Sequence, residues 1–451
     1  MTQQGDRNGV DARWSAEQVL ALAPDAASRK AGSRLGSAGP WSEHGAHGGA
    51  VWGLCKGSGS KPYRIVVDTA GPAYKCSCPS RKFPCKHALG LLLLWSSGTG
   101  SLPDAAAVPE WAEPWLAARK ERASAPKPTA AAASADPEAA RRRAERRAQR
   151  ITAGTAELEQ RLADLVSGGL AAADRSGYAL WEETAARMVD AQAPGLASRV
   201  RELGAVPSSG PGWHVRLLEE CGLLHLLDRA WAARESLPAP LAATVRARVG
   251  LPTAPGPDAG VRDRWLVLAQ YDTSDGKLTT RRIHLHGTAT GRPALLLSFG
   301  AAGRAPELAL PVGLAVDAEA AFHPGALPLR AQLGESSRPL AGTGERPPGT
   351  DAAGAAAAYG ERLRDDPWLE SWPLTLAAAI PAPHGESWQL ADADGRSALP
   401  LTSSFARSPG LWRLVALSGG APLRVFGELG HRGFDPLTAW TADSTELVPL
   451  R

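Results

Sequence analysis

Cysteine, lysine and long apolar runs are scarce in this chain of 451 residues, and each scarcity excludes a class of protein. The five cysteines are too few and too clustered for the disulfide framework of a small secreted protein. The longest apolar run, residues 88–95, is far shorter than the roughly 20 residues of a membrane span. Residues 1–10 are polar and lack the apolar core of a secretory signal. We therefore expect a cytoplasmic protein with reduced thiols and no membrane span.

The overall composition indicates the number of domains and the type of genome that encodes the protein. The length predicts about three domains, and the hydrophobic content of 44% allows each of them a buried core. The formal net charge of +4 excludes a uniform polycation. The 41 arginines against 9 lysines, with 48 glycines and 37 prolines, are typical of a high-GC bacterial genome. Alanine-rich segments therefore carry little information about structure.

The N-terminal region, residues 1–117, alternates helical and strand patterns. Ser15 and Gln18 have the spacing of a capping box in front of a short apolar helix. Residues 51–55 and 63–68 are rich in β-branched and aromatic side chains, which predicts two strands. Residues 87–95, HALGLLLLW, are apolar on every side and predict a buried helix.

The remainder of the chain divides by composition and periodicity. Residues 118–135 combine alanine, proline and charge without apolar periodicity, which predicts a linker. Residues 136–250 predict a helical domain, with Pro137 at its first helical position and Cys221 on an apolar face. From residue 262 to residue 451 the apolar period shifts towards two. The predicted fold class is therefore α+β and multidomain, with a small N-terminal module, a helical middle region and a β-rich C-terminal domain.

Within the C-terminal region, several segments each predict a pair of strands. Residues 265–287 form a pair around an Asp275-Gly276 turn, and residues 388–401 repeat the pattern. Residues 412–429 follow it again, with Gly419-Gly420 as the turn. Between these pairs we expect a long loop over residues 335–354 and a short helix near residues 359–369.

The densest chemistry lies in residues 75–87, KCSCPSRKFPCKH. Cys76, Cys78, Cys85 and His87 offer the thiolate and imidazole ligands that zinc prefers in a tetrahedral site. Residues two apart in a strand face the same side, so Cys76 and Cys78 can share one ion, and His87 can turn inward with Cys85. Four protein ligands leave no position for a reacting water molecule, which predicts one structural zinc ion and no catalytic one.

A simpler interpretation is that these residues are buried thiols and a solvent-exposed histidine. A disulfide between Cys76 and Cys78 would be badly strained at that separation, so it is not expected. Cys55 could join the metal site, but a full ligand set exists without it, and we expect it to be a strand residue.

The spacing C-x-C, a short gap and C-x-H, preceded by two strands and followed by an apolar helix, resembles the SWIM zinc finger. The resemblance implies a ββα module over about residues 51–98, with Cys76, Cys78, Cys85 and His87 as zinc ligands, that binds DNA or other proteins. The longer stretch around it is similar to stand-alone bacterial SWIM proteins, which often accompany AAA ATPases and von Willebrand factor A-type proteins. The resemblance covers about residues 10–100 and assigns no function to the C-terminal half.

Positive charge is concentrated on this module. Residues 51–100 contain seven basic side chains and one acidic one, a net charge of +6, whereas the whole chain carries +4. Such a patch beside a metal-held loop suits nucleic-acid phosphates or a protein partner. The same lysines could instead only offset the thiolate charge around zinc. The candidate binding residues are Lys61, Arg64, Lys75, Arg81, Lys82 and Lys86.

Three further patterns indicate no additional site. The arginine-rich residues 141–150 favour a solvated helix over a nucleic-acid arm. His284 and His286 lack ligand partners at useful spacing, so exposed strand positions are expected. Residues 392–395 resemble the opening of a calcium loop but lack its later acidic ligands, which favours a hairpin turn. No catalytic motif is found, so we predict neither catalytic residues nor a small-molecule substrate.

Three hypotheses for function follow. The first is a non-enzymatic, zinc-binding protein whose finger docks nucleic acid, with DNA as the expected form, while the rest of the chain serves assembly. The second is a protein–protein interaction adaptor, for a partner such as an AAA ATPase, that does not touch nucleic acid. The third is an enzyme in the C-terminal half, which a cleft with converging acids and histidines would indicate.

Overall fold

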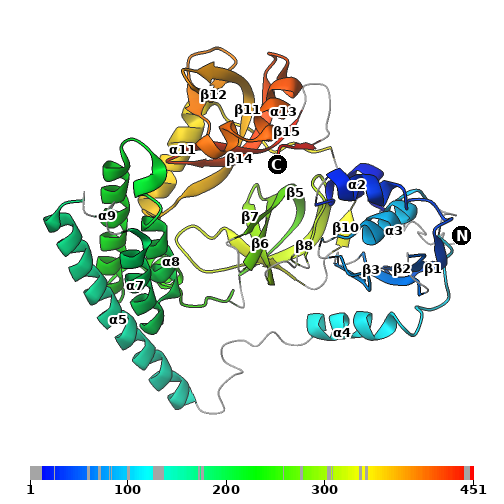
Figure 1. Ribbon diagram of the computed structural model, residues 1–451, viewed down its shortest axis with the longest axis horizontal. Helices are drawn as coiled ribbons and strands as arrows, with labels where there is room; N and C mark the ends of the chain where they lie inside the picture. The colour runs from blue at the N-terminus through cyan, green and yellow to red at the C-terminus, as the bar shows by residue number, and fades with distance from the viewer. Residues whose placement is uncertain are drawn as a thin grey trace, which may run out of the picture.

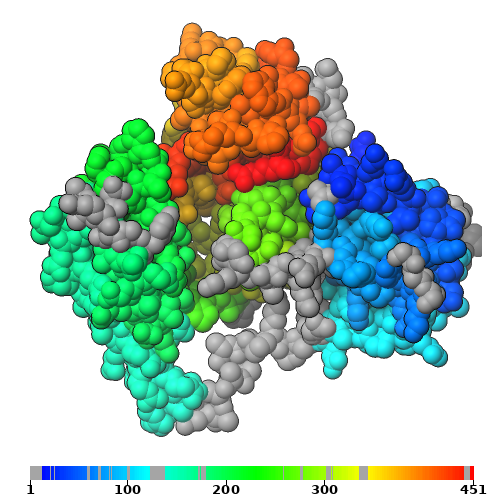
Figure 2. Space-filling model, in the orientation of Figure 1, coloured from blue at the N-terminus to red at the C-terminus, as the bar shows by residue number. Residues whose placement is uncertain are grey.

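The computed structural model describes most of residues 13–451. The residues that it does not describe are 1–12, 25, 58–60, 70–72, 81, 83, 99–101, 125–136, 171–172, 174–176, 257–258, 275–277, 302–305, 307, 335–337, 341–343 and 441–446. The N-terminal part and a helical bundle lie at opposite ends of the molecule, with one large β-sheet between them and a second sheet beside it (Figure 1; Figure 2). The α+β prediction is therefore confirmed.

The N-terminal part is built on a four-stranded antiparallel sheet. Its strands are β1 (Trp41–His47), β2 (Ala50–Cys55), β3 (Tyr63–Asp68) and β4 (Ala73–Cys76), in sequence order. Strands β2 and β3 confirm the two predicted strands. Strands β1 and β4 were not predicted, because β1 is rich in glycine, histidine and serine and β4 has only four residues.

Helices cover both faces of this sheet. On one face lies α3 (Lys86–Ser96), with residues 87–95 all buried as its apolar sequence predicts, and α1 (Ala16–Ala21) and α2 (Ala26–Ser33) pack against it. The capping box of Ser15 and Gln18 is present at the start of α1. On the other face lies α4 (Glu113–Ser124), shown below the sheet in Figure 1.

The predicted linker begins later than expected. Helix α4 continues to Ser124, so residues 118–124 are helical. The helix is held in place because Trp115 and Leu116 pack on the sheet through the cluster that contains Trp52 and Val66. Arg119 adds an ion pair of 3.1 Å with Asp68 at the end of β3. The rest of the predicted linker, residues 125–135, lies outside the described residues, as does Asp136.

The middle region is a helical bundle. Its helices are α5 (Pro137–Gly168), α7 (Gly177–Asp190), α8 (Pro194–Leu203), α9 (Trp213–Ala232) and α10 (Ala239–Arg248), with the short 3-10 helix η1 (Pro207–Ser209) before α9. Cys221 is 3% exposed within the bundle core, as predicted. Most of the arginine-rich segment is exposed on α5, where Arg141 and Arg142 pair with glutamates one helical turn away.

Two six-stranded sheets make up the C-terminal part. The first holds β5 (Gly260–Ser274), β6 (Leu278–Gly287), β7 (Pro293–Ala301), β8 (Ala315–Phe322), β9 (Arg330–Leu333) and β10 (Arg338–Leu340), in the order β10-β8-β5-β6-β7-β9. The second holds β11 (Ser371–His384), β12 (Ser387–Asp392), β13 (Ala398–Pro400), β14 (Leu423–Gly430), β15 (Gly433–Trp440) and β16 (Leu447–Pro449), in the order β13-β12-β11-β14-β15-β16. Helices α11 (Ala352–Asp365), α12 (Ser403–Ala406) and α13 (Pro409–Ser418) pack with the second sheet.

Two predictions for this part were wrong in detail. The first half of the expected strand pair 412–429 is helix α13, because Ser408 caps its N-terminus, Pro409 begins it, and Gly419 ends it with a left-handed φ of 52°. The expected loop 335–354 contains β10 and the start of α11, whose N-terminus Asp351 caps.

His284 lies buried between the two large sheets, so the prediction that it is exposed was wrong. The side chain is 1% exposed and contacts Tyr271 and Phe426, with ring centroids 6.0 Å and 5.7 Å away. Its Nε2 atom lies 3.9 Å from the Glu428 carboxylate on β14. Burial lowers the pKa of His284 to about 4, so the ring is neutral at neutral pH. His286 is only partly buried.

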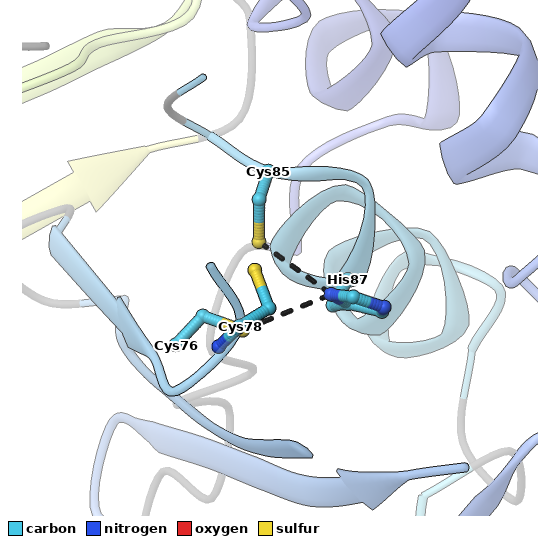
Figure 3. Close-up of side chains that lie close together, drawn as sticks. All are labelled: Cys76, Cys78, Cys85 and His87. Carbon is cyan, nitrogen blue, oxygen red and sulfur yellow. Dashed lines mark hydrogen bonds between the residues drawn. The ribbon is translucent and has the colours of Figure 1, made fainter. Parts of the chain in front are cut away.

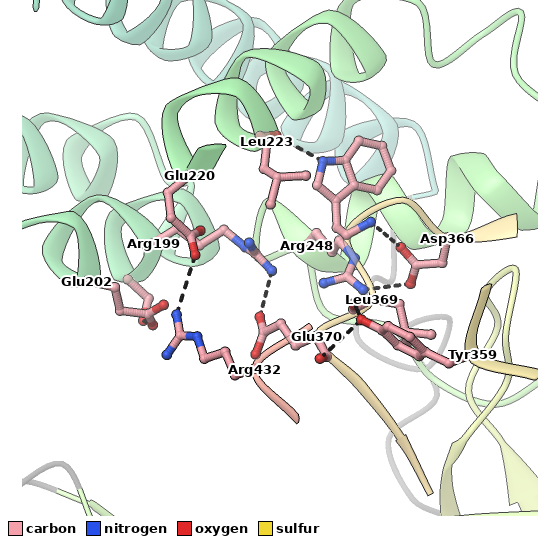
Figure 4. Close-up of polar contacts among 12 residues, drawn as sticks. Arg199, Glu202, Glu220, Leu223, Arg248, Tyr359, Asp366, Leu369, Glu370 and Arg432 are labelled. Atoms are coloured by element: carbon pink, nitrogen blue, oxygen red, sulfur yellow. Dashed lines mark hydrogen bonds and ion pairs between the residues drawn. The ribbon is translucent and has the colours of Figure 1, made fainter. Parts of the chain in front are cut away.

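Trp368 anchors the bundle to the second sheet. It follows α11 in the chain, yet it is 3% exposed within the bundle core and donates its indole N–H to the carbonyl oxygen of Leu223. Two ion pairs flank it, Arg248 with Asp366 at 2.6 Å and Arg199 with Glu370 at 2.9 Å (Figure 4).

The N-terminal part shares a continuous core with the first large sheet. One cluster of buried residues joins α3 and the small sheet to residues of β5 to β9, including Trp265 and Phe322. Burial raises the pKa of Tyr74 to about 12 at this contact, against the opposing effect of nearby Arg281. The finger and this sheet therefore pack as one hydrophobic unit. Within the described part of the chain, no helix is long and apolar enough to cross a membrane.

Candidate metal centre

Three structural elements bring the four predicted ligands together (Figure 3). Cys76 is the last residue of β4, and Cys78 lies just beyond it. Cys85 is the N-cap residue of α3, and His87 lies in the first turn of that helix. Strand β4 ends at Cys76. The Cys78 thiol is therefore directed towards the site by the turn after the strand, and not by the alternation of side chains in an extended strand.

The spacing of the ligand atoms fits a tetrahedral zinc ion. The three Sγ atoms and a ring nitrogen of His87 all lie within 4.8 Å of one another. Nδ1 of His87 is 3.8 Å from Sγ of Cys76 and 4.0 Å from Sγ of Cys85. Zinc bonds of about 2.3 Å to sulfur and about 2.0 Å to nitrogen would place the ligand atoms roughly 3.6–3.8 Å apart. The four side chains therefore need to move only by fractions of an ångström to close around one ion.

The surroundings of the site favour a structural ion. Cys85 is 2% exposed and His87 is 5% exposed, and the His87 ring packs on Tyr63 with ring centroids 4.8 Å apart. The backbone N–H of Cys78 points to Sγ of Cys76 at 3.5 Å, a geometry that stabilises a thiolate. With four protein ligands the coordination sphere is closed, so the ion would hold the loop to the helix and activate no water molecule.

The three thiols compete for protons when no cation is bound. The pKa of Cys78 is lowered by its hydrogen bond with Cys76 and, next, by the one with Cys85. The pKa of Cys76 is raised, chiefly by its hydrogen bond with Cys78. Ionisation of the Cys78 thiol is therefore favoured while ionisation of the neighbouring Cys76 thiol is disfavoured. A divalent cation removes this competition because it replaces the protons.

The predicted basic residues do not form one surface. Arg64 and Lys75 lie on the face of the small sheet that α4 covers: Lys75 pairs with Val66, whose side chain packs in the cluster beneath α4. The Arg64 guanidinium lies 5.9 Å from the ring of Trp111 on the same side. Lys61 is exposed just before β3.

Lys82 and Lys86 lie together on the other side, beside the metal site. They line a cavity of about 550 Å³ with Lys56, which is one of the seven basic side chains of the module but was not among the candidate binding residues. Lys56 follows β2 directly, and its place beside the other two lysines depends on the tertiary arrangement of distant segments, which no spacing along the chain indicates. Arg81 lies outside the described residues.

Comparison with known protein families agrees with this geometry. Residues 65–95 match the SWIM zinc finger. The chain contains a SWIM zinc finger. Residues 146–249 match the SWIM-associated four-helix bundle domain, which covers the bundle from within α5 to the end of α10. A search of curated proteins and a search of solved structures each gave no match.

The SWIM finger and its four-residue cluster together support one bound zinc ion. They also support a domain that interacts with nucleic acid or protein. The bundle match adds a second SWIM-associated unit that sequence reasoning had described only as helical.

Proposed function

We propose that this protein docks nucleic acid, with DNA as the expected form, through the basic surface beside its zinc site. The observation that carries the proposal is the convergence of Lys56, Lys82 and Lys86 on one cavity, with no carboxylate among its described lining residues. Three lysine ammonium groups that line one cavity make a favourable position for phosphate oxygens, since binding releases condensed counterions.

The architecture supports the same function. The zinc site joins Cys78 to the start of α3, which fixes the loop that carries Lys82 relative to the helix that carries Lys86. All three lysines are exposed. Lysines on a rigid frame lose less conformational freedom when they bind phosphate, so affinity rises for the same charge. The protein in this proposal is non-enzymatic and cytoplasmic, and its bundle and C-terminal sheets serve assembly.

One observation favours the alternative of an adaptor for a protein such as an AAA ATPase. The bundle carries a cavity of about 420 Å³ that is lined mainly by apolar side chains, among them Leu158, Leu165 and Trp181. Such a groove suits an apolar segment of a protein partner better than a phosphate backbone. In that case the finger would be a structural neighbour of the bundle and the lysines would not contact nucleic acid.

A salt series on the zinc-loaded full chain distinguishes the two functions. The binding of a fluorescent oligonucleotide should weaken with salt along a log–log slope of about −2 to −3, since three lysines can neutralise about three phosphates. The double variant Lys56→Ala and Lys82→Ala should reduce this slope by about 1–2 units and keep the bound zinc, because neither residue is a ligand.

Lys30→Ala is the matched control. Lys30 is an exposed lysine on α2, near the cavity but not among its lining residues, so its removal should leave the slope unchanged. Absence of oligonucleotide binding by wild-type protein near physiological salt would refute the proposal and leave the adaptor as the better explanation.

A further inference from the structure

The cavity beside the zinc site has walls from α2, the end of β2, and the zinc loop together with the start of α3. Helix α2 contributes Ala27 and Ala31, the end of β2 contributes Lys56, and the zinc loop and the start of α3 contribute Lys82 and Lys86. Its volume of about 550 Å³ falls in the range of about 300–1,000 Å³ that is typical of small-molecule sites. A duplex backbone that only lies across a basic surface does not require a hollow of this size.

The lining has two chemically different sides. One side carries the three lysines Lys56, Lys82 and Lys86. The other side is mainly apolar: it carries Ala27, Ala31 and Leu35, with the largely buried Ser28 between the two alanines. An occupant that matches both sides must combine an anionic group with a flat or apolar body. A nucleotide has this combination, because its phosphate is anionic and its base has an apolar face.

Tyr63 adds an aromatic wall that is held in position. Its ring packs on His87, and a Cβ atom on Gly57 would lie only 2.5 Å from its Cε2 atom. Only glycine therefore allows the backbone after β2 to pass this close to the ring. The ring is fixed from two sides before any ligand arrives, so its ordering does not reduce the affinity for an occupant.

We propose that this cavity receives one unpaired nucleotide, with the phosphate on the lysines and the base against the apolar wall. Duplex bases are paired and stacked, so they cannot enter, whereas a single strand can turn one base inward. The inference rests on the proposed function and deepens it: the protein should prefer single-stranded to double-stranded nucleic acid.

The test fills the cavity without changing its charge. Ala27 is exposed and lines the cavity, so Ala27→Phe should occupy the space of the base. We measure the anisotropy of a labelled single-stranded oligonucleotide and of its blunt duplex on the zinc-loaded full chain at one salt concentration. Wild-type protein should bind the single strand about tenfold more tightly, as expected for one stacked base. Ala27→Phe should reduce this ratio to about one and leave duplex affinity unchanged.

Ala26→Phe is the matched control, because Ala26 is the exposed neighbour on α2 that does not line the cavity. It should keep the wild-type ratio. Free dTMP should compete with the single-stranded oligonucleotide for the wild-type cavity and should not compete in Ala27→Phe. Such competition would show that a free nucleotide can also occupy the cavity. Equal affinity of wild-type protein for the two oligonucleotides, or a ratio unchanged by Ala27→Phe, overturns the inference but leaves phosphate docking intact. If wild-type protein binds neither the single-stranded oligonucleotide nor the duplex, the proposed function itself is overturned.

Discussion

Sγ of Cys76 lies 3.8 Å from Nδ1 of His87, although the two residues are eleven positions apart along the chain. The contact joins the end of β4 to the first turn of α3, across the zinc loop. The zinc loop between these two residues carries Lys82, and α3 carries Lys86, and both lysines line the cavity. Metal binding, folding of the finger and presentation of the basic surface are therefore expected to depend on one another.

Cys78→Ser should abolish zinc binding and unfold the finger, because the site and the local fold form together. Elemental analysis of purified wild-type protein should give one zinc ion per chain, and the variant should give none. Cys55→Ala is the control, since Cys55 is a fully buried thiol outside the four-residue cluster and should not be needed for zinc binding. Loss of zinc from Cys55→Ala with Cys78→Ser still loaded would contradict the ligand assignment.

His284→Leu should change how stability depends on pH. Burial lowers the pKa of His284 from 6.5 to about 4, so in this range the folded state binds fewer protons than the unfolded state. The stabilisation is present above pH 6.5 and is lost as pH falls towards 4, with a slope of at most about 1.4 kcal/mol per pH unit. Urea unfolding followed at several pH values should show a weaker decline for the variant. An identical decline in both proteins would show that other groups control this range.

Trp368→Ala should weaken the attachment of the bundle to the second sheet. The side chain is 3% exposed and its indole N–H donates to Leu223, so truncation should lower the free energy of unfolding by about 3–5 kcal/mol. Thermal unfolding measures the change. Trp412→Ala is the control, because Trp412 is 64% exposed and its removal should shift stability far less. Similar losses in the two variants would argue against the anchoring role.

Proteolysis within residues 118–136 should nick the chain without separating its parts. The N-terminal part shares one buried cluster with the first large sheet, including Tyr74 and Trp265, and this contact does not pass through the cut segment. The two fragments should co-elute in size-exclusion chromatography and separate only in denaturant. Release of a free N-terminal fragment under native conditions would contradict the shared core.

Local patterns were sufficient to predict the metal site and much of the fold. The ligand set, strands β2 and β3, the buried helix α3 and the apolar face around Cys221 each depend on residues close in sequence. The capping box of Ser15 and Gln18 was predicted for the same reason, because its two residues are close in sequence.

Contacts between distant segments were not predictable in this way. His284 is buried because Phe426 and Glu428, more than a hundred residues later, cover the strand. The apolar pattern of residues 412–418 suggests a strand. The segment is nevertheless helical, with Ser408 and Gly419 capping its two ends. Lys56 lies beside Lys82 and Lys86 because distant segments pack around one cavity, which no spacing along the chain indicates.

Hydrogen–deuterium exchange of the zinc-loaded full chain, with and without a single-stranded oligonucleotide, shows where nucleic acid binds. We expect slower exchange of backbone amides near Lys56 and from Lys82 to His87, with little change in the bundle, because the nucleic acid should cover the cavity beside the zinc site. Protection confined to α5–α10, or no protection at oligonucleotide concentrations that saturate binding, would contradict this expectation.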